Sequence, residues 1–215
     1  MTDPILDAWL SVIAADGWAG ARIDAVAEHG GTTTAVVAAT LPDRWAALAA
    51  FGRALDVSAL GEAGVDREAS VRDRLFSVLM ARFDAALDYR DAARVLALAA
   101  PRDPGLAAFM ALGVVRSVAR LAAAAGVATG GFVGPLRVQA LTVVYLAVAR
   151  VWLADDSPVL AVTMKELDTR LAQVETWARR LPNRLPPLST DATPSPYRPA
   201  LPAAAPRSAA GPSAG

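Results

Sequence analysis

The helix-breaking residues of this chain gather at a few short places, and their positions constrain the fold more than any other feature of the sequence. Between them alanine, leucine and arginine dominate, and the alternation of β-branched residues typical of strands is scarce. The breaks fall at residues 16–17, 30–31, 41–42, 61–66, 100–104, 126–131 and 155–158. We therefore predict an all-α protein of about nine helices, the last with Ser157 as its N-cap and Pro158 as its first residue.

The final segment, residues 181–215, has a different composition. It holds nine of the 15 prolines, with alanine, serine and glycine between them, and it shows no apolar periodicity. Such a segment cannot build a core, so we expect it to be disordered or locally polyproline II. The first three predicted helices are short and the later ones are longer. The sequence therefore predicts a head over residues 1–55, a helical body over residues 56–180 and a tail over residues 181–215.

Apolar residues in the predicted head favour a small bundle of three helices. They recur at helical spacing in three stripes: Leu6, Leu10 and Ile13; Ile23, Val26 and Ala27; and Val36, Val37 and Leu41. The second and third segments are joined by a tight turn at Gly30 and Gly31. Two short helices joined in this way, packed on a third, predict a helix-turn-helix.

The head also resembles a known family. It contains the stretches DGWAGARIDAVAEHGGTTT, from residue 16, and LPDRWAALAAF, from residue 41, whose spacing resembles the N-terminal domain of TetR-type transcriptional regulators over residues 4–55. This resemblance implies a TetR-like fold and a ligand-responsive regulator that binds operator DNA as a homodimer. On this basis the expected DNA-binding residues are Thr32, Thr33, Thr34, Thr40 and Arg44.

The recognition segment departs from the family in its side chains. Where TetR-type proteins commonly have a tyrosine, a basic or polar residue, a histidine and a phenylalanine, this chain has Ala38, Ala39, Thr40 and Leu41. Residues 1–55 contain three arginines and six acidic residues, a formal charge of −3. Because lysine and arginine supply most of the affinity for phosphates, this charge weakens the case for DNA binding, although hydroxyls and backbone N–H groups at helix N-termini can still hold phosphates.

The body resembles a second family. It contains SVRDRLFSVLMARFDAALDYRDAARVLALAAPRDP, from residue 70, and VYLAVARVWLADDSPVLAVTMKELDTRL, from residue 144. Both stretches resemble the C-terminal region of the lipid-binding accessory protein of ubiquinone biosynthesis, whose fold is itself TetR-like. This resemblance implies an alternative function, a lipid- or isoprenoid-binding accessory protein that does not bind DNA.

The body has apolar faces that could enclose a ligand or simply form a packed core. If they enclose a cavity, its expected lining is Met80, Phe83, Phe109, Met110 and Tyr145. These side chains, with few inward charges, favour a hydrophobic small molecule or lipid as the ligand.

The last predicted helix has an apolar seam of heptad type. Its residues recur at alternating spacings of four and three: Leu160, Met164, Leu167, Leu171, Val174 and Ala178. The preceding helix is apolar over much of its circumference, through Val143, Leu146 and Ala147 among others. Because we do not expect one chain to cover both helices, we predict a homodimer joined by a four-helix bundle of these two helices from each subunit, with the seam in the interface.

Several classes of function find no support in the sequence. Cysteine is absent, His29 is the only histidine, and no phosphate-binding, metalloprotease or nucleophile-elbow motif occurs. We therefore expect neither an enzyme nor a bound metal or cofactor. Asp155 and Asp156 are interpreted as charges that complement the dipole of the last helix.

The most apolar segment, residues 131–153, is long enough to suggest a transmembrane helix. It contains Arg137, Gln139 and Arg150, and a charge at the centre of a bilayer costs at least about 2.5 kcal/mol. We therefore interpret it as a buried helix of a soluble bundle. The N-terminus has no basic region before an apolar run, which favours a cytoplasmic protein without a transmembrane segment.

Overall fold

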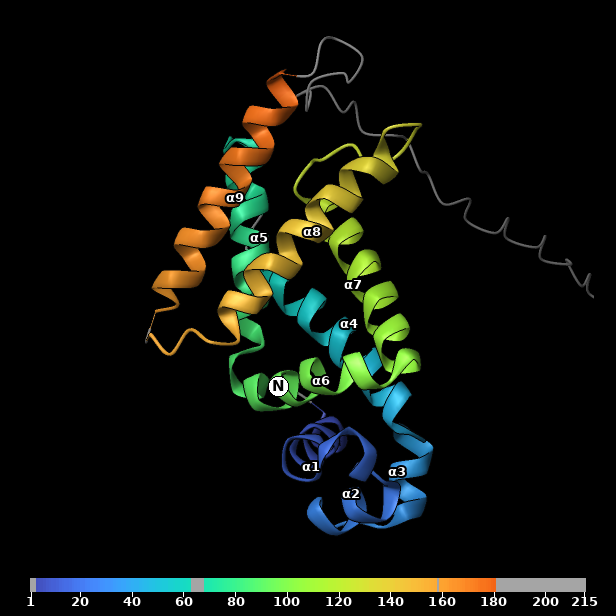
Figure 1. The fold of residues 1–215 in the computed structure, drawn as a ribbon. Helices are drawn as coiled ribbons and strands as arrows, with labels where there is room; N and C mark the ends of the chain where they lie inside the picture. The colour runs from blue at the N-terminus through green and yellow to red at the C-terminus, as the bar shows by residue number, and fades with distance from the viewer. Residues whose placement is uncertain (1–2, 63–67, 158, 181–215) are drawn as a thin grey trace, which may run out of the picture.

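The computed structural model describes residues 3–62, 68–157 and 159–180, and these residues form helices and their connections (Figure 1). Nine α-helices lie within the described ranges: α1 Pro4–Gly20, α2 Ile23–His29, α3 Thr34–Thr40, α4 Arg44–Glu62, α5 Val71–Ala85, α6 Arg90–Ala99, α7 Pro104–Ala124, α8 Gly134–Trp152 and α9 Ala161–Arg180. The predicted all-α fold of nine helices is confirmed. Pro158 and the predicted tail lie outside the described residues.

The helices α1, α2 and α3 form the head, at one end of the molecule (Figure 1). Their shared core contains Trp9, Leu10, Ile13, Val26 and Val37, all nearly inaccessible to solvent. The Trp9 indole also donates a hydrogen bond to the Leu41 carbonyl at 3.2 Å, which fixes the end of α3 against α1. The residues of the three predicted stripes are buried with two exceptions: Ile23 is half-buried and Val36 is exposed.

The predicted break at residues 16–17 is a kink inside α1. Gly17 has a φ of 80° and a ψ of 171°, and α1 continues beyond it to Gly20. A residue with a side chain would be strained at this positive φ, so glycine permits the bend. The bend carries Trp18 toward the body, where its indole meets Asp103.

The helix α4 runs from the head into the body and joins the two (Figure 1). Its buried residues include Ala47, near the head, and Phe51, Leu55 and Ala59 further along. Phe51 packs edge-on against Tyr89, with ring centroids 5.3 Å apart. Tyr89 ends a 3-10 turn, Leu87–Tyr89, that separates α5 from α6, a break that the sequence did not predict.

The remaining helices form the body, in which α8 packs between α7 and α9. Val144, Tyr145 and Val148 of α8 point into the core. The segment predicted as a buried helix of a soluble bundle is therefore α8, buried along one side. Among the described helices, α7 alone is long and apolar enough to cross a membrane by length and composition, and it packs against α4 and α8.

The helix α9 begins at Ala161, three residues after the predicted start at Pro158. Leu160, just before it, has a φ of 50°, outside the helical region. The Ser157 hydroxyl accepts a hydrogen bond from the Ala161 N–H at 2.9 Å. Ser157 thus caps the first turn of α9 as the sequence suggested, but from a position further upstream.

Candidate functional site

The recognition helix α3 presents a surface without charge. Its exposed side chains are Thr34, Ala35, Val36, Ala38, Ala39 and Thr40. Thr33 is the N-cap of α3, and its hydroxyl accepts from the Val36 N–H at 3.3 Å. The Thr40 hydroxyl donates to the Val36 carbonyl at 3.1 Å. Thr32 is half-buried in the turn before α3. The predicted DNA-binding threonines thus lie on α3 and in the turn before it, and two of their hydroxyls already serve α3 itself.

Arg44, the predicted basic contact, is held by the head. Its Nη1 donates to the Trp18 carbonyl at 2.8 Å, and its guanidinium carbon lies 4.6 Å from the centroid of the Trp18 ring. The Trp18 indole in turn donates to Asp103 Oδ2 at 3.0 Å. Arg44 thus lies at the junction of head and body, and only part of its guanidinium is left to contact a phosphate.

A groove of about 550 Å³ lies beside the head core, lined by Trp9, residues 21–24 and residues 42–45. Arg22 lies on its rim with its side chain largely exposed, and its Nη2 is 3.1 Å from Asp24 Oδ2. The hydrogen bond from Arg22 lowers the pKa of Asp24. With Arg44, Arg22 is the second basic side chain that lines this groove, and it was not among the predicted site residues. Its position directly before α2 is the sequence signal that could have identified it.

The centre of the body holds a buried polar cluster that joins four helices. Arg82 of α5 donates from Nε to Asp56 Oδ1 of α4 and to Ser117 Oγ of α7, each at 3.0 Å, and from Nη1 to the Tyr145 hydroxyl of α8. The Ser117 hydroxyl donates to Asp56 Oδ1, and Arg120 of α7 donates from Nε to Asp56 Oδ2 at 3.0 Å. The expectation of few inward charges is wrong here, because Asp56 and Arg82 are both buried.

The charges in this cluster are well compensated. Burial raises the pKa of Asp56, but hydrogen bonds from Ser117, Arg120 and Arg82 outweigh it and hold the pKa below its ordinary value. Asp56 is therefore ionised at neutral pH and neutralises Arg82. The sequence signal for Arg82 is its spacing, since it follows Leu75, Val78 and Leu79 on the same helical stripe.

The five predicted ligand residues do not share one location. Phe83 and Tyr145 stack in the core with ring centroids 5.0 Å apart, and Met80 is also buried. Phe109 instead packs against Trp45, at 5.2 Å, near the junction with the head, and Met110 is half-buried. The prediction that all five converge is therefore wrong for Phe109. None of the five lines the head groove or the second groove described below.

The apolar seam of α9 packs mainly on its own chain. Leu160, Leu167 and Leu171 are buried in the single chain, whereas Met164 is exposed and Val174 half-buried. The three leucines cannot form a dimer interface, because they have almost no surface left to bury, and this part of the prediction is wrong. The side chain of Ala178 lies outside the described residues. Besides Met164, the exposed apolar residues of this region include Leu136, Val143 and Leu146 on α8, Val162 on α9 and Val159 just before it.

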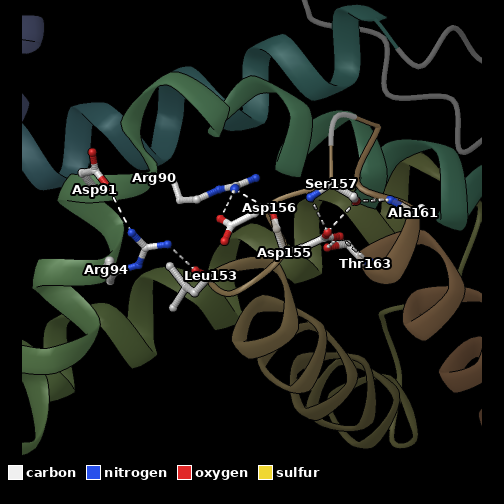
Figure 2. A network of polar contacts seen from close by, with 9 residues as sticks. All are labelled: Arg90, Asp91, Arg94, Leu153, Asp155, Asp156, Ser157, Ala161 and Thr163. Atoms are coloured by element: carbon white, nitrogen blue, oxygen red, sulfur yellow. Dashed lines mark hydrogen bonds and ion pairs between the residues drawn. The ribbon is translucent and has the colours of Figure 1, made fainter.

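Figure 2 shows the polar network at the junction of α8 and α9. The buried carboxylate of Asp155 accepts four hydrogen bonds, from the backbone N–H and the hydroxyl of both Ser157 and Thr163. Burial raises the pKa of Asp155, but these four bonds outweigh it and hold the pKa far below its ordinary value. As predicted, Asp155 lies at the N-terminal end of α9, where it caps the helix.

Two arginines of α6 hold the backbone of the same loop. Arg90 Nη1 donates to the Asp155 carbonyl at 2.6 Å, and Arg94 Nη2 donates to the Leu153 carbonyl at 2.7 Å. The exposed Asp156 carboxylate lies 3.7 Å from Arg90 Nη1. A groove of about 490 Å³ borders the loop and is lined by Arg150, Val151, residues 154–157 and Val162.

Comparison with solved structures identifies this arrangement of head and body. The chain matches the crystal structure of the TetR transcriptional regulator from Nitrosomonas europaea with a TM-score of 0.68 and 20% identity, over 81% of this chain and 97% of that one. It matches a transcriptional regulator from Rhodococcus sp. Rha1 with a TM-score of 0.54 and 20% identity, over 82% and 97%. The protein therefore has the TetR-type fold, as the resemblance of the head implied.

Comparison of the sequence adds no closer relationship. No protein-family model matches the chain, and no curated protein matches it. The resemblance of the body to the ubiquinone-biosynthesis accessory protein therefore has no counterpart in these comparisons.

Proposed function

We propose that the protein is a TetR-type transcriptional regulator that binds DNA as a homodimer and responds to a small ligand in its body. The observation that carries this proposal is the fold, which matches solved transcriptional regulators over both the head and the body. Nothing in the described residues resembles a metal site, since no group of three histidine, aspartate or glutamate side chains comes together there.

DNA would be held by hydroxyl and backbone groups with few ionic contacts. Thr34 and Thr40 are exposed on α3, and Arg22 and Arg44 lie to either side of the head groove. Each phosphate neutralised by a basic side chain adds to the salt dependence of binding. With about two such contacts per head, affinity should fall less steeply with salt than for a head rich in lysine and arginine.

The homodimer would form through the exposed face of α8. Leu136, Val143 and Leu146 follow one another on that face, and Val162 of α9 lies nearby on the groove at the α8–α9 junction. Exposed apolar side chains that cluster in this way mark interaction sites, and a two-fold axis would let the same face cover itself. A dimer is also what the reading of two operator half-sites requires.

DNA binding is tested by fluorescence anisotropy with fragments from beside the protein's own gene and with a genomic fragment library, at low and moderate salt. We expect saturable binding that Thr34→Ala and Arg22→Ala both weaken, with Arg22→Ala also reducing the salt dependence. Arg53→Ala serves as the control, because Arg53 is exposed on α4 beyond the head groove. Absence of binding above background to every fragment at low salt would reject the regulator function.

A second function is favoured by the surface of α3. This helix exposes Val36 and alanines with no charged side chain, and the head is acidic, which suits a helix-turn-helix that no longer contacts DNA. The body would then bind a lipid or isoprenoid for a partner enzyme of ubiquinone biosynthesis. Recovery of such a lipid from the purified protein, together with the absence of DNA binding, would support this alternative.

A further inference from the structure

Arg90 carries a positive charge into the body without a buried counter-charge. Its side chain is only 16% exposed, and its ion pair is with Asp156, whose carboxylate is 90% exposed and 3.7 Å away. The nearby carboxylate of Asp155 is occupied by Ser157 and Thr163, and only its backbone carbonyl meets Arg90. The Nε–H of Arg90 is buried and has no hydrogen-bond partner in the part of the chain that the structure describes.

Trp152 supplies a second unpartnered donor at the same place. The residue is 4% exposed, and its indole N–H is buried without an acceptor among the described residues. The guanidinium carbon of Arg90 lies 5.3 Å from the centroid of the Trp152 ring. Two buried donors, one of them charged, therefore belong to one contact between the start of α6 and the end of α8.

The cluster around Arg82 shows how this chain completes a comparable site. Arg82 is buried to a similar degree, and its Nε–H meets the Asp56 carboxylate at 3.0 Å. A buried charge is costly unless it is paired, and a buried donor without an acceptor loses the hydrogen bond that water gave it. A water molecule would satisfy the two donors near Trp152 but would leave the charge of Arg90 uncompensated. The missing component is an acceptor that is also an anion.

We propose that Arg90 and Trp152 bind the carboxylate of a small organic acid, whose apolar part lies in the groove of about 490 Å³ that borders the same loop. This groove is lined by Val151, Ala154 and Val162 together with Asp155 and Asp156, whose side chains are drawn in Figure 2. The inference rests on the proposed regulator function, because it identifies the organic acid as the effector of that regulator.

The charge requirement is tested by isothermal titration calorimetry on the full chain with octanoate and octanamide, which share length and shape and differ in charge. Benzoate and benzamide form a second pair. We expect saturable binding of at least one of the two carboxylates at one site per chain, with its amide bound at least about tenfold more weakly. Equal binding of acid and amide, or no saturable binding of either carboxylate at millimolar concentration, would overturn the proposal.

The location is tested with variants of the two loop-holding arginines. Arg90→Gln should weaken binding of the carboxylate at least about tenfold, because it removes a charged hydrogen bond. Arg94→Gln is the matched control, since Arg94 also donates to a loop carbonyl but has no buried unpartnered atom, and it should change the affinity less than about twofold. If both variants weaken binding equally, the effect comes from the loop and the site is refuted.

Trp152→Phe isolates the indole donor, because it keeps an aromatic ring and removes the N–H. We expect weaker binding of the carboxylate with unchanged helicity by circular dichroism, and an unchanged affinity would contradict the indole's role. The comparison of acid and amide in the parent protein does not depend on any variant folding. Because none of these measurements contains DNA, failure of carboxylate binding and failure of the regulator function are separate results.

Discussion

At the scale of single residues, the most consequential side chain outside the core is Asp155, which replaces the missing helical hydrogen bonds at the start of α9. Its carboxylate accepts from the backbone N–H groups of Ser157 and Thr163 and from both their hydroxyls. The N–H groups of a first helical turn have no partner within the helix, and a carboxylate there also complements the helix dipole. Thr163 itself is fully buried, so water cannot take over this task.

We predict that Asp155→Asn destabilises the protein at neutral pH by about 1–3 kcal/mol, since an amide cannot accept all four bonds. Because folding lowers the pKa of Asp155, its contribution to stability is fully present above the ordinary pKa of 3.8 and is lost as the pH falls below that value. Urea unfolding at pH 7 and below pH 3.8 should therefore show a larger difference between parent and variant at pH 7.

The matched control for this prediction is Asp156→Asn, at the exposed neighbouring carboxylate. It should change stability by less than about 0.5 kcal/mol, as is usual for surface substitutions. A destabilisation by Asp155→Asn that grows as the pH falls would contradict the assigned role.

A second prediction concerns Arg82 in the buried polar cluster. Arg82→Met leaves the Asp56 carboxylate buried with only Ser117 and Arg120 as partners, and we expect a loss of about 3–5 kcal/mol. The double variant Asp56→Leu/Arg82→Met removes both charges and should be more stable than Arg82→Met alone. Denaturant unfolding of the three proteins measures both effects. A double variant less stable than the single one would show that the pair contributes through packing and not through charge.

At the scale of helices, the sequence predicted which helices exist better than it predicted where each helix begins and ends. Breaks marked by glycine or proline were found, but the break between α5 and α6 falls at Leu87–Tyr89, where neither residue occurs. The start of α9 was placed too early, because Ser157 reaches the first turn from upstream and the Asp155 carboxylate, from the same loop, completes the cap. The helix propensities of single residues contain no information about a loop that turns back to bond the first turn of the helix after it.

Periodicity also failed to show which chain buries the seam of α9, and it did not show the polar centre. The seam of α9 is real, but a pattern shows only that a face is buried and not which chain buries it, and Leu167 and Leu171 lie in the core of their own chain. In the same way, a list of the apolar residues along α5 leaves out Arg82. Its position on the apolar stripe was the feature that indicated a buried charge. Its partners come from α4, α7 and α8, and only the tertiary structure brings them together.

The dimer prediction therefore belongs to α8. Val143 and Leu146 are 60% and 45% exposed in the single chain and lie on one face of the helix. We predict that the parent sediments as a dimer and that Val143→Arg/Leu146→Arg sediments as a folded monomer, because the substitution places four like charges in one two-fold interface. Val57→Arg, at an exposed apolar position on α4, is the control and should remain dimeric. A parent that is monomeric at tens of micromolar would also weigh against the regulator function, since a single head reads only half an operator.

At the scale of the whole molecule, the head is fused to the body and not tethered to it. The helices α1 and α6 pack along each other, and the Tyr89 hydroxyl donates to Asp7 Oδ1 of α1 at 2.6 Å. The same α6 holds the loop before α9 through Arg90 and Arg94. A displacement of that loop by a ligand would therefore reach the head through one rigid helix, which gives the proposed regulator a physical route from ligand to DNA.

The last prediction tests the contact between head and body at the other end of α1, where Trp18 meets Asp103. Trp18→Phe keeps an aromatic ring between Arg44 and Trp45 but removes the indole donor to Asp103, the N-cap of α7. The hydrogen bonds from the Leu106 N–H and from Trp18 lower the pKa of Asp103, so this carboxylate is charged and its bond to the indole is strengthened. We expect a measurable loss in the stability of the entire chain, in a single transition. Trp45→Phe is the matched control, because Trp45 meets Trp18 and Phe109 through ring contacts alone in the described part of the structure.

Far-UV circular dichroism and tryptophan fluorescence should give coincident unfolding curves for the parent and both variants. Two separated transitions in the parent would show instead that head and body unfold independently, and a ligand in the body could then not act on the head through packed helices.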